Sequence, residues 1–259
     1  MRNPRVLAAR KLLRRAERER AGAFLVEGPL GVRDALRAGL ATELFVAEEG
    51  HGFGELIDLA ERSGVDAFLA GPGVIEALSD TTTPQGVVAV ARANSCGTDE
   101  LEGSTLVTVL AGVRDPGNAG TLIRSSLAAG ADGVVMPRGA VDPFNPKTVR
   151  AAAGALFAIR VAVPDGIEGA LQELKGLGLR LIGADARSAA PPEEVDLTEP
   201  VALVLGNEAW GIPGGQAALL DAIVGIPMPG PAESLNVGIA GSILLFEAVR
   251  QRRLSSRFQ

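Results

Sequence analysis

Short apolar runs alternate with helical stretches along most of this chain, and this alternation limits the fold more than any other feature of the sequence. The run at 106–111 is apolar at almost every position, as expected of a strand that is buried on both faces. Similar runs at 133–136, 180–184 and 201–205 are separated by stretches with helical periodicity. Strands that alternate with helices predict a mostly parallel sheet covered by helices. The sequence therefore predicts an α/β protein.

The same pattern divides the chain into two domains. Small and polar residues at 93–103 indicate a linker between a small α/β domain at 1–92 and a parallel-sheet α/β domain at 104–259. The elements expected in the first domain are strands at 23–26, 44–47, 67–70 and 86–91 and helices at 4–18, 29–38, 54–63 and 73–79. Besides the four apolar runs given above, the second domain is expected to contain strands at 159–163 and 223–226 and helices at 119–129, 146–157, 166–176 and 237–250.

The composition excludes several classes of protein. The chain has 259 residues, 47% of them hydrophobic, which is enough for a real core in one or two domains. No run of 18 apolar residues occurs and no apolar signal segment follows the start, so we expect a cytoplasmic protein without a membrane span. A single cysteine, Cys96, excludes an internal disulfide, and a single histidine, His51, makes a Ser-His-Asp triad improbable. We expect no bound metal.

Positive charge is concentrated at the start of the chain, although the protein as a whole has a formal net charge of −6. Residues 1–20 contain eight Arg or Lys residues and two Glu residues. A basic patch on an acidic body can bind the phosphates of a nucleic acid while the body resists nonspecific binding. On charge alone, a solvated amphipathic helix explains this stretch equally well.

Three polar loops follow expected strands, where parallel sheets bind their ligands. In the first, we expect Asn118 to cap a helix that begins at Ala119. Arg124 then lies in the first turns of this helix and brings a guanidinium to the end of the strand. The structural alternative is a surface arginine that pairs with Asp115.

The second loop follows the buried run at 201–205. Gly206 would let the backbone approach a ligand closely, and Glu208 would then lie in the crevice at the end of the strand. An ordinary turn between a strand and a helix is the alternative.

The third loop, 226–237, is stiffened by three prolines. Ser234 or Asn236 can cap the last helix, whose positive end would point at the crevice. The glycines of this helix, Gly238 and Gly241, are expected where another part of the chain passes very close, and simple core packing is the alternative. Neither a Walker A sequence nor a G-x-G-x-x-G loop after a strand is present, which argues against a nucleotide-dependent enzyme acting on small molecules.

Together the three loops resemble the SpoU (TrmH-type) RNA ribose methyltransferases of the SPOUT class. The matching residues are Asn118, Gly120 and Arg124 in the first loop, Gly206, Asn207, Glu208 and Gly211 in the second, and Ile226, Pro227, Met228, Ser234, Leu235 and Asn236 in the third. The segment 145–157 also resembles the family, although Ala152 stands where many relatives have serine. More loosely, residues 1–92 resemble the L30e-like RNA-binding domain that often precedes this catalytic unit.

The resemblance implies a deep trefoil knot in the second domain, a homodimer that packs through the knotted domain, and sites bordered by both protomers. It implies S-adenosylmethionine as cofactor, held by Leu205, Gly206, Ile226, Met228, Ser234 and Leu235. It implies catalytic roles for Arg124, Asn118, Glu208, Ser234 and Asn236. Since arginine stays protonated in nearly every protein, we expect Arg124 to orient the ribose 2′-hydroxyl, and whether it also accepts the proton stays open.

We expect structured RNA to contact a basic footprint made of Arg10, Lys11, Arg14, Arg15, Arg18, Arg138, Lys147 and Arg150. The separate first domain favours 23S ribosomal RNA over transfer RNA as the substrate. A transfer RNA methyltransferase and a catalytically inactive RNA-binding member of the family are the alternatives, and intact Arg124, Asn118, Ser234 and Asn236 argue against the inactive one.

Overall fold

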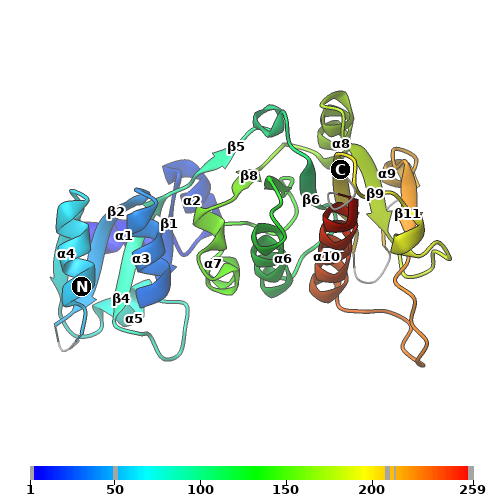
Figure 1. Ribbon diagram of the computed structural model, residues 1–259. Coiled ribbons are helices and arrows are strands. Elements are labelled where there is room, and N and C mark those ends of the chain that lie inside the picture. The colour runs from blue at the N-terminus through cyan, green and yellow to red at the C-terminus, as the bar shows by residue number, and fades with distance from the viewer. Residues whose placement is uncertain (1–2, 49–51, 208–210, 213, 256–259) are drawn as a thin grey trace. The chain divides into compact units, whose positions relative to one another are not determined.

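The computed structural model describes residues 3–48, 52–207, 211–212 and 214–255 (Figure 1). These residues form two compact units. The first contains the described residues up to Asn94 together with Pro143–Ala158, and the second contains Ser95–Asp142 and the described residues from Ile159 onward. Within the part of the chain that the structure describes, no helix is long and apolar enough to cross a membrane.

The first unit is built on a four-stranded mixed sheet of order β1-β4-β2-β3. Strand β4 runs antiparallel to both β1 and β2, whereas β2 and β3 are parallel. The strands are β1 (Ala23–Glu27), β2 (Ala41–Ala47), β3 (Asp66–Ala70) and β4 (Val87–Arg92), and the helices that follow β1, β2 and β3 are α3 (Pro29–Arg37), α4 (Gly54–Arg62) and α5 (Val74–Leu78).

The helix predicted at 4–18 is two helices, α1 (Pro4–Lys11) and α2 (Arg15–Ala21). Leu12, at the break, is 6% exposed and packs into the core of the unit. Arg18 is 5% exposed and donates a hydrogen bond to the Leu12 carbonyl at 2.8 Å. The end of a helix leaves carbonyl groups without intrahelical partners, and Arg18 satisfies one of them. Arg18 therefore does not face solvent with the other basic residues of this stretch.

Residues 143–158, which the sequence placed in the second domain, pack with the first unit. The Phe24 ring of β1 lies 4.8 Å from the Phe144 ring and 6.2 Å from the Phe157 ring, measured between centroids. The helix predicted at 146–157 ends early: α7 spans Pro146–Ala152, and a 3₁₀ turn spans Ala155–Phe157. Ala153 and Gly154, between them, have φ values of 46° and 84°, which a helix cannot continue through.

The second unit contains a seven-stranded sheet of order β11-β9-β10-β6-β7-β8-β5, in which every neighbouring pair is parallel. The sheet confirms the predicted parallel α/β fold. Its strands are β5 (Ser95–Cys96), β6 (Leu106–Leu110), β7 (Gly133–Val135), β8 (Arg160–Ala162), β9 (Arg180–Ala184), β10 (Val201–Leu205) and β11 (Ala222–Val224). All five residues of β6 and of β10 are buried, as their apolar sequences require.

Residues 95–103, most of the segment predicted as a linker, belong to this second unit. Ser95 and Cys96 form the edge strand β5 beside β8, and Leu101 in the following 3₁₀ turn, Asp99–Leu101, is fully buried. The small and polar residues that suggested a linker therefore belong to a short edge strand and its turn, where side chains reach solvent.

Helices α6 (Pro116–Ala128), α8 (Ile167–Gly176), α9 (Gly214–Ala217) and α10 (Val237–Ser255) complete the second unit. Helices α6 and α10 lie side by side (Figure 1), and the Ser125 and Ser242 hydroxyl oxygens are 2.7 Å apart between them. A Cβ atom at Gly241 would lie 2.4 Å from Leu122 Cδ2 and 2.6 Å from Leu205 Cδ1, so this glycine lets α10 pack closely on α6 and β10.

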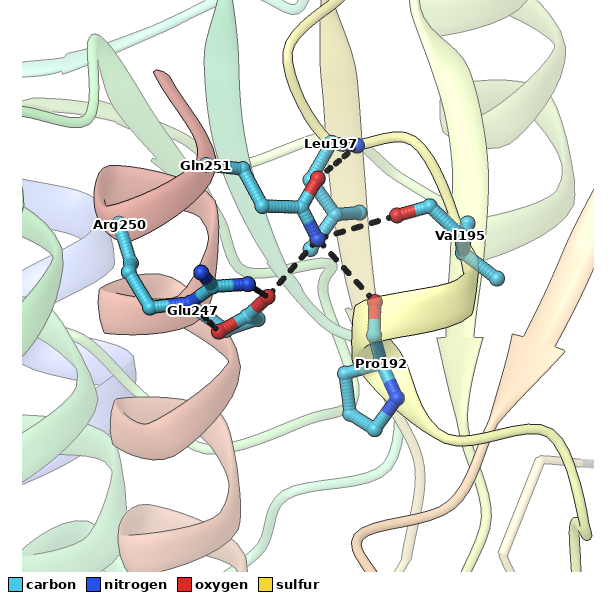
Figure 2. Close-up of polar contacts among 6 residues, drawn as sticks. All are labelled: Pro192, Val195, Leu197, Glu247, Arg250 and Gln251. Carbon is cyan, nitrogen blue, oxygen red and sulfur yellow. Dashed lines mark hydrogen bonds and ion pairs between the residues drawn. The ribbon is translucent and has the colours of Figure 1, made fainter. Parts of the chain in front are cut away.

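A glutamine near the end of α10 fixes the chain that leads into β10 (Figure 2). The Gln251 side-chain amide donates to the Pro192 and Val195 carbonyls at 3.2 Å, and its oxygen accepts from the Leu197 N–H at 2.9 Å. Glu247, one turn earlier, accepts from Gln251 and from Arg250. These contacts tie α10 to the segment that precedes β10.

Candidate active site

A pocket of about 480 Å³ lies beyond the carboxyl ends of three neighbouring parallel strands, β9, β10 and β11. The loop 226–236 and the first turns of α10 supply its remaining walls. Open parallel sheets bind ligands at this position, and small-molecule sites typically measure about 300–1,000 Å³. The six residues expected to hold the cofactor all line it: Leu205, Gly206, Ile226, Met228, Ser234 and Leu235.

The backbone after β6 touches the backbone after β10, and glycines make the contact possible. A Cβ atom at Gly112 would lie 2.5 Å from the Asn207 N atom, and one at Gly206 would lie 2.5 Å from the Gly211 carbonyl carbon. Asn207 and Gly211 exchange two backbone hydrogen bonds of 2.8 and 2.9 Å. Gly206 lines the pocket, and on the side where a Cβ atom would lie the space is filled by the backbone of its own loop.

The starts of α6 and α10 meet through two asparagines. Helix α6 begins at Pro116, and Asp115 caps it by accepting from the Asn118 N–H at 2.9 Å, so the prediction that Asn118 is the cap is wrong. Asn236 caps α10, because its Oδ1 accepts from the Gly238 N–H at 2.9 Å. Its Nδ2 donates to Asn118 Oδ1 at 3.0 Å. The side chain of Asn118 thus joins the two helix starts.

Arg124 lies on an exposed part of α6 and does not line the pocket. Its guanidinium has no hydrogen bond or ion pair to any described residue, Asp115 included. Ser234 lies on the pocket wall. Glu208 is outside the described residues, as are Trp210 and His51.

The sequence did not single out two charged residues that line the pocket, Asp185 and Arg187. Arg187 donates to Asp185 from Nε at 3.0 Å and from Nη2 at 2.7 Å, and its backbone N–H donates at 2.9 Å. The side-chain hydrogen bond from Arg187 is the main reason that the pKa of Asp185 is lowered, so this carboxylate stays ionised at neutral pH. The signal that could have found both residues is their position directly after the strand at 180–184.

The residues expected to contact RNA are placed in different surroundings. Arg10, Lys11, Arg14, Arg15, Arg138 and Lys147 are exposed. Arg15 pairs with Glu19 at 2.8 Å and Arg138 with Asp165 at 2.9 Å.

Arg150 differs from these exposed residues. Its guanidinium lies 3.5 Å from Glu27 Oε2 and 3.4 Å from Asp80 Oδ2, so two carboxylates already balance its charge. An arginine that is already paired with two carboxylates is expected to bind a phosphate less strongly.

Among the described residues, no group of three or more His, Cys, Asp or Glu side chains is arranged to hold a metal ion.

Two family models match this chain. The model described as the SpoU rRNA Methylase family matches residues 105–246, and the one described as an MRM3-like substrate binding domain matches residues 3–89. The chain is 34% identical to the 23S rRNA (guanosine(2553)-2'-O)-methyltransferase RlmP of Bacillus subtilis, over 94% of this chain and 95% of that protein. It is 31% identical to the 23S rRNA (uridine(2479)-2'-O)-methyltransferase of Streptomyces viridochromogenes, over 92% of this chain and 86% of that protein.

Solved structures agree with these matches over almost the whole chain. The SpoU methyltransferase AviRb from Streptomyces viridochromogenes, in complex with the cofactor AdoMet, has a TM-score of 0.87 at 31% identity and covers 97% of this chain and 99% of its own. An AdoMet-bound rRNA methyltransferase from Sinorhizobium meliloti has a TM-score of 0.84 at 32% identity and covers 96% of this chain and 95% of its own.

Proposed function

The chain belongs to the SpoU rRNA methylase family, and from that premise we propose that it transfers the methyl group of S-adenosylmethionine to a ribose 2′-oxygen of 23S ribosomal RNA. The observation that carries the proposal is the pocket formed by the loops after β9, β10 and β11. The loop after β6 contacts the loop after β10, and the hydrogen bond between Asn118 and Asn236 joins the α10 wall of the pocket to α6. Work on ribosomal RNA would place the protein in the cytoplasm.

The residues present fit S-adenosylmethionine. Apolar side chains of Leu205, Val237 and Leu244 suit an adenine ring, and the backbone near Gly206 offers polar groups to its edge. Asp185 and Glu233 add negative charge to the wall beside the positive charge of Arg187. A wall with more negative than positive charge suits a sulfonium compound of net positive charge. We assign Leu205, Gly206, Ile226, Met228, Ser234 and Leu235 to cofactor binding.

In the reaction, the residues of this chain position and shield the RNA nucleotide. When bound, S-adenosylmethionine supplies a methyl group activated by a sulfonium. The Arg124 guanidinium orients the ribose 2′-hydroxyl and a neighbouring phosphate. Asn118 and Asn236, held to each other at 3.0 Å, keep the two helix starts in place. Ser234 offers a hydroxyl at the edge of the pocket.

The direct test is to incubate the purified protein with labelled S-adenosylmethionine and separate pools of 23S, 16S and transfer RNA, all unmodified. We expect label in 23S RNA at a single ribose, mapped by resistance of the adjacent phosphodiester to alkaline cleavage. If only transfer RNA is labelled, the substrate is transfer RNA and not 23S ribosomal RNA. Binding of RNA without any transfer would indicate an inactive family member.

We also propose that two copies of the chain form a homodimer that completes the site. An apolar stripe of Ile239, Ile243 and Phe246 on α10 is 53%, 41% and 50% exposed. The Ser125 and Ser242 side chains face each other between α6 and α10. Successive residues of a helix are rotated by about 100°, so the Arg124 side chain leaves α6 on the same side of the helix pair as the apolar stripe of α10. A second copy covering the stripe would therefore also close over Arg124.

Phe246→Asp is expected to convert the dimer to monomers, because a charge at the centre of an apolar interface has no partner. The dissociation constant should rise about 30-fold or more, the effect of losing a central aromatic contact. Sedimentation equilibrium over a concentration series measures it. Leu69→Asp is the control, since Leu69 is 70% exposed on β3 in the other unit and should leave the mass unchanged. A monomeric wild type, or a dimer unaffected by Phe246→Asp, would contradict the proposal.

The first unit supplies the main RNA contact in this proposal. Arg10, Lys11, Arg14 and Arg15 are exposed around the break between α1 and α2, while Leu12 anchors the break in the core. Two short helices fixed in this way present several cations at once, which suits the phosphates of a folded RNA. Arg138 and Lys147 are secondary candidates, and Arg150 is a weaker one because Glu27 and Asp80 flank it.

Replacing Arg10, Lys11 and Arg14 together by glutamine is expected to weaken RNA binding and its salt dependence. Each phosphate contact contributes roughly 0.7–0.9 to the slope of log affinity against log salt, so the slope should fall by about 2 to 3. Filter binding between low and physiological salt measures it. Arg37→Gln with Arg62→Gln, two exposed arginines of α3 and α4, serves as the control. An unchanged slope would remove this surface from the RNA footprint.

We further propose that the second domain contains the trefoil knot that the resemblance to the SPOUT class implies. The support is the agreement with solved SpoU methyltransferases along nearly the entire chain. The domain limits proposed from the sequence, 1–92 and 104–259, then need two amendments, because residues 143–158 pack with the first unit and residues 95–103 belong to the second.

A further inference from the structure

We propose that Asp185 and Arg187 hold the charged amino-acid end of S-adenosylmethionine, with the guanidinium on the α-carboxylate and the carboxylate on the α-ammonium. The inference rests on the proposed function, since it takes the pocket as the cofactor site. It adds two residues to that site, and it separates the recognition of the amino acid from the recognition of adenosine.

The pair is placed on the pocket wall by β9. Asp185 follows the last residue of this strand, and the Asp185 N–H donates to the Val224 carbonyl, which fixes its backbone against β11. The Asp185 side chain is 19% exposed, whereas that of Arg187 is 77% exposed. A mostly buried carboxylate thus holds an arginine that extends towards solvent at the pocket.

The pair has binding capacity left. Arg187 uses Nε and Nη2 on Asp185, and no hydrogen bond to Nη1 occurs among the described residues. A guanidinium has five N–H donors, so an incoming carboxylate can be bound while contact with Asp185 persists. Carboxylate oxygens likewise accept more than one hydrogen bond each, which leaves Asp185 able to accept from an ammonium group.

Gly211 keeps the space beside the pair open. A Cβ atom at this position would lie 3.1 Å from Asp185 Oδ2 and 3.4 Å from Arg187 Nη2, and the φ of 68° is one that glycine adopts without strain. The chain therefore brings a residue without a side chain against both charged groups, on the loop that also carries Gly206.

The charges on the pocket wall match one part of the ligand better than the rest. Asp185, Arg187 and Glu233 are the charged side chains on the described wall, and elsewhere much of it is apolar. Adenine and ribose are uncharged and need no ion partner. An α-amino acid carries one positive and one negative group close together, which an adjacent carboxylate and guanidinium can satisfy reciprocally.

The test compares S-adenosylhomocysteine with 5′-methylthioadenosine. Both ligands contain adenosine and the thioether sulfur, but the second has a methyl group on the sulfur in place of the amino-acid chain. Calorimetry of Arg187→Ala is expected to show about 10-fold to 100-fold weaker binding of S-adenosylhomocysteine, the range for losing charged hydrogen bonds. Binding of 5′-methylthioadenosine should stay within about 2-fold. Arg187→Lys should recover part of the lost affinity for S-adenosylhomocysteine. Asp185→Asn should weaken the binding of S-adenosylhomocysteine but not that of 5′-methylthioadenosine.

A matched control exists on α10. Arg250 makes a two-point contact with Glu247 at 2.7 Å for each hydrogen bond, outside the pocket (Figure 2). Arg250→Ala should change neither affinity. Equal weakening of both ligands by Arg187→Ala, or no weakening of either, would overturn the proposal while leaving the cofactor site intact. Failure of the wild type to bind either ligand would overturn the cofactor site itself, and this inference with it.

Discussion

Replacing Arg124 by alanine is expected to lower kcat for methyl transfer by about 10²-fold to 10⁴-fold, the usual contribution of a positioned group that handles a reacting hydroxyl. The reason is that Arg124 is an exposed guanidinium with no partner among the described residues, so its side chain holds no part of the described fold in place. Affinity for S-adenosylhomocysteine should stay within about 2-fold, because Arg124 does not line the pocket. Single-turnover transfer with saturating RNA, together with calorimetry, separates the two effects.

Two further variants sharpen this result. Arg124→Lys should recover little activity, since a lysine cannot present two parallel N–H groups to a hydroxyl and a phosphate. Arg37→Ala, which removes another exposed helical arginine, should leave turnover unchanged. Near-normal turnover of Arg124→Ala would exclude the arginine from the reaction.

The parallel sheet could be predicted because its central strands are buried on both faces. In β6 and β10 every side chain is buried, and such strands cannot tolerate the polar alternation of a half-exposed sheet. The position of the pocket could be predicted for a related reason. Ligands bind beyond the carboxyl ends of parallel strands, which points to the loops that begin at Gly206 and Ile226, whereas the roles of single residues in holding the cofactor came from the resemblance to the family.

Other features depend on contacts between distant residues, which local patterns do not reveal. The order of strands places β9 between β10 and β11, and only this order brings Asp185 and Arg187 to the pocket. The packing of Phe144 against Phe24 joins residues that are far apart in the sequence and draws the segment 143–158 to the first unit. The break in the first helix is likewise stabilised by a buried arginine that sequence reasoning assigned to RNA.

Gly206→Ala is expected to weaken cofactor binding with a smaller effect on folding. The added methyl group would lie 2.5 Å from the Gly211 carbonyl carbon and 2.6 Å from its oxygen, and because backbone rather than a flexible side chain is in the way, the loop must move. Overpacking of this kind costs about 1–3 kcal/mol, so affinity for S-adenosylhomocysteine should fall by about 10-fold to 100-fold. Calorimetry measures the affinity, and thermal unfolding checks that the fold persists.

The matched control for Gly206→Ala is Gly169→Ala. Gly169 lies inside α8, and a Cβ atom there would meet nothing within 4 Å. This substitution should leave binding unchanged and raise stability slightly, since alanine favours a helix over glycine by about 0.5–1 kcal/mol. Unchanged binding in Gly206→Ala would mean that the ligand does not depend on the loop that contains Gly206.

Arg124→Ala and Gly206→Ala together test whether the site is shared between protomers, provided that S-adenosylmethionine is kept between the dissociation constants of the wild type and of Gly206→Ala. If Arg124 serves the pocket of its partner, a mixed dimer of Arg124→Ala and Gly206→Ala chains has one site with both defects and one with neither. Random exchange makes half of all dimers mixed, so an equimolar mixture should recover about a quarter of wild-type activity. If Arg124 serves its own pocket, every site in the mixture carries one defect and the activity stays at the level of the parents. The same mixture made with Phe246→Asp in both chains should recover nothing, because exchange requires the dimer.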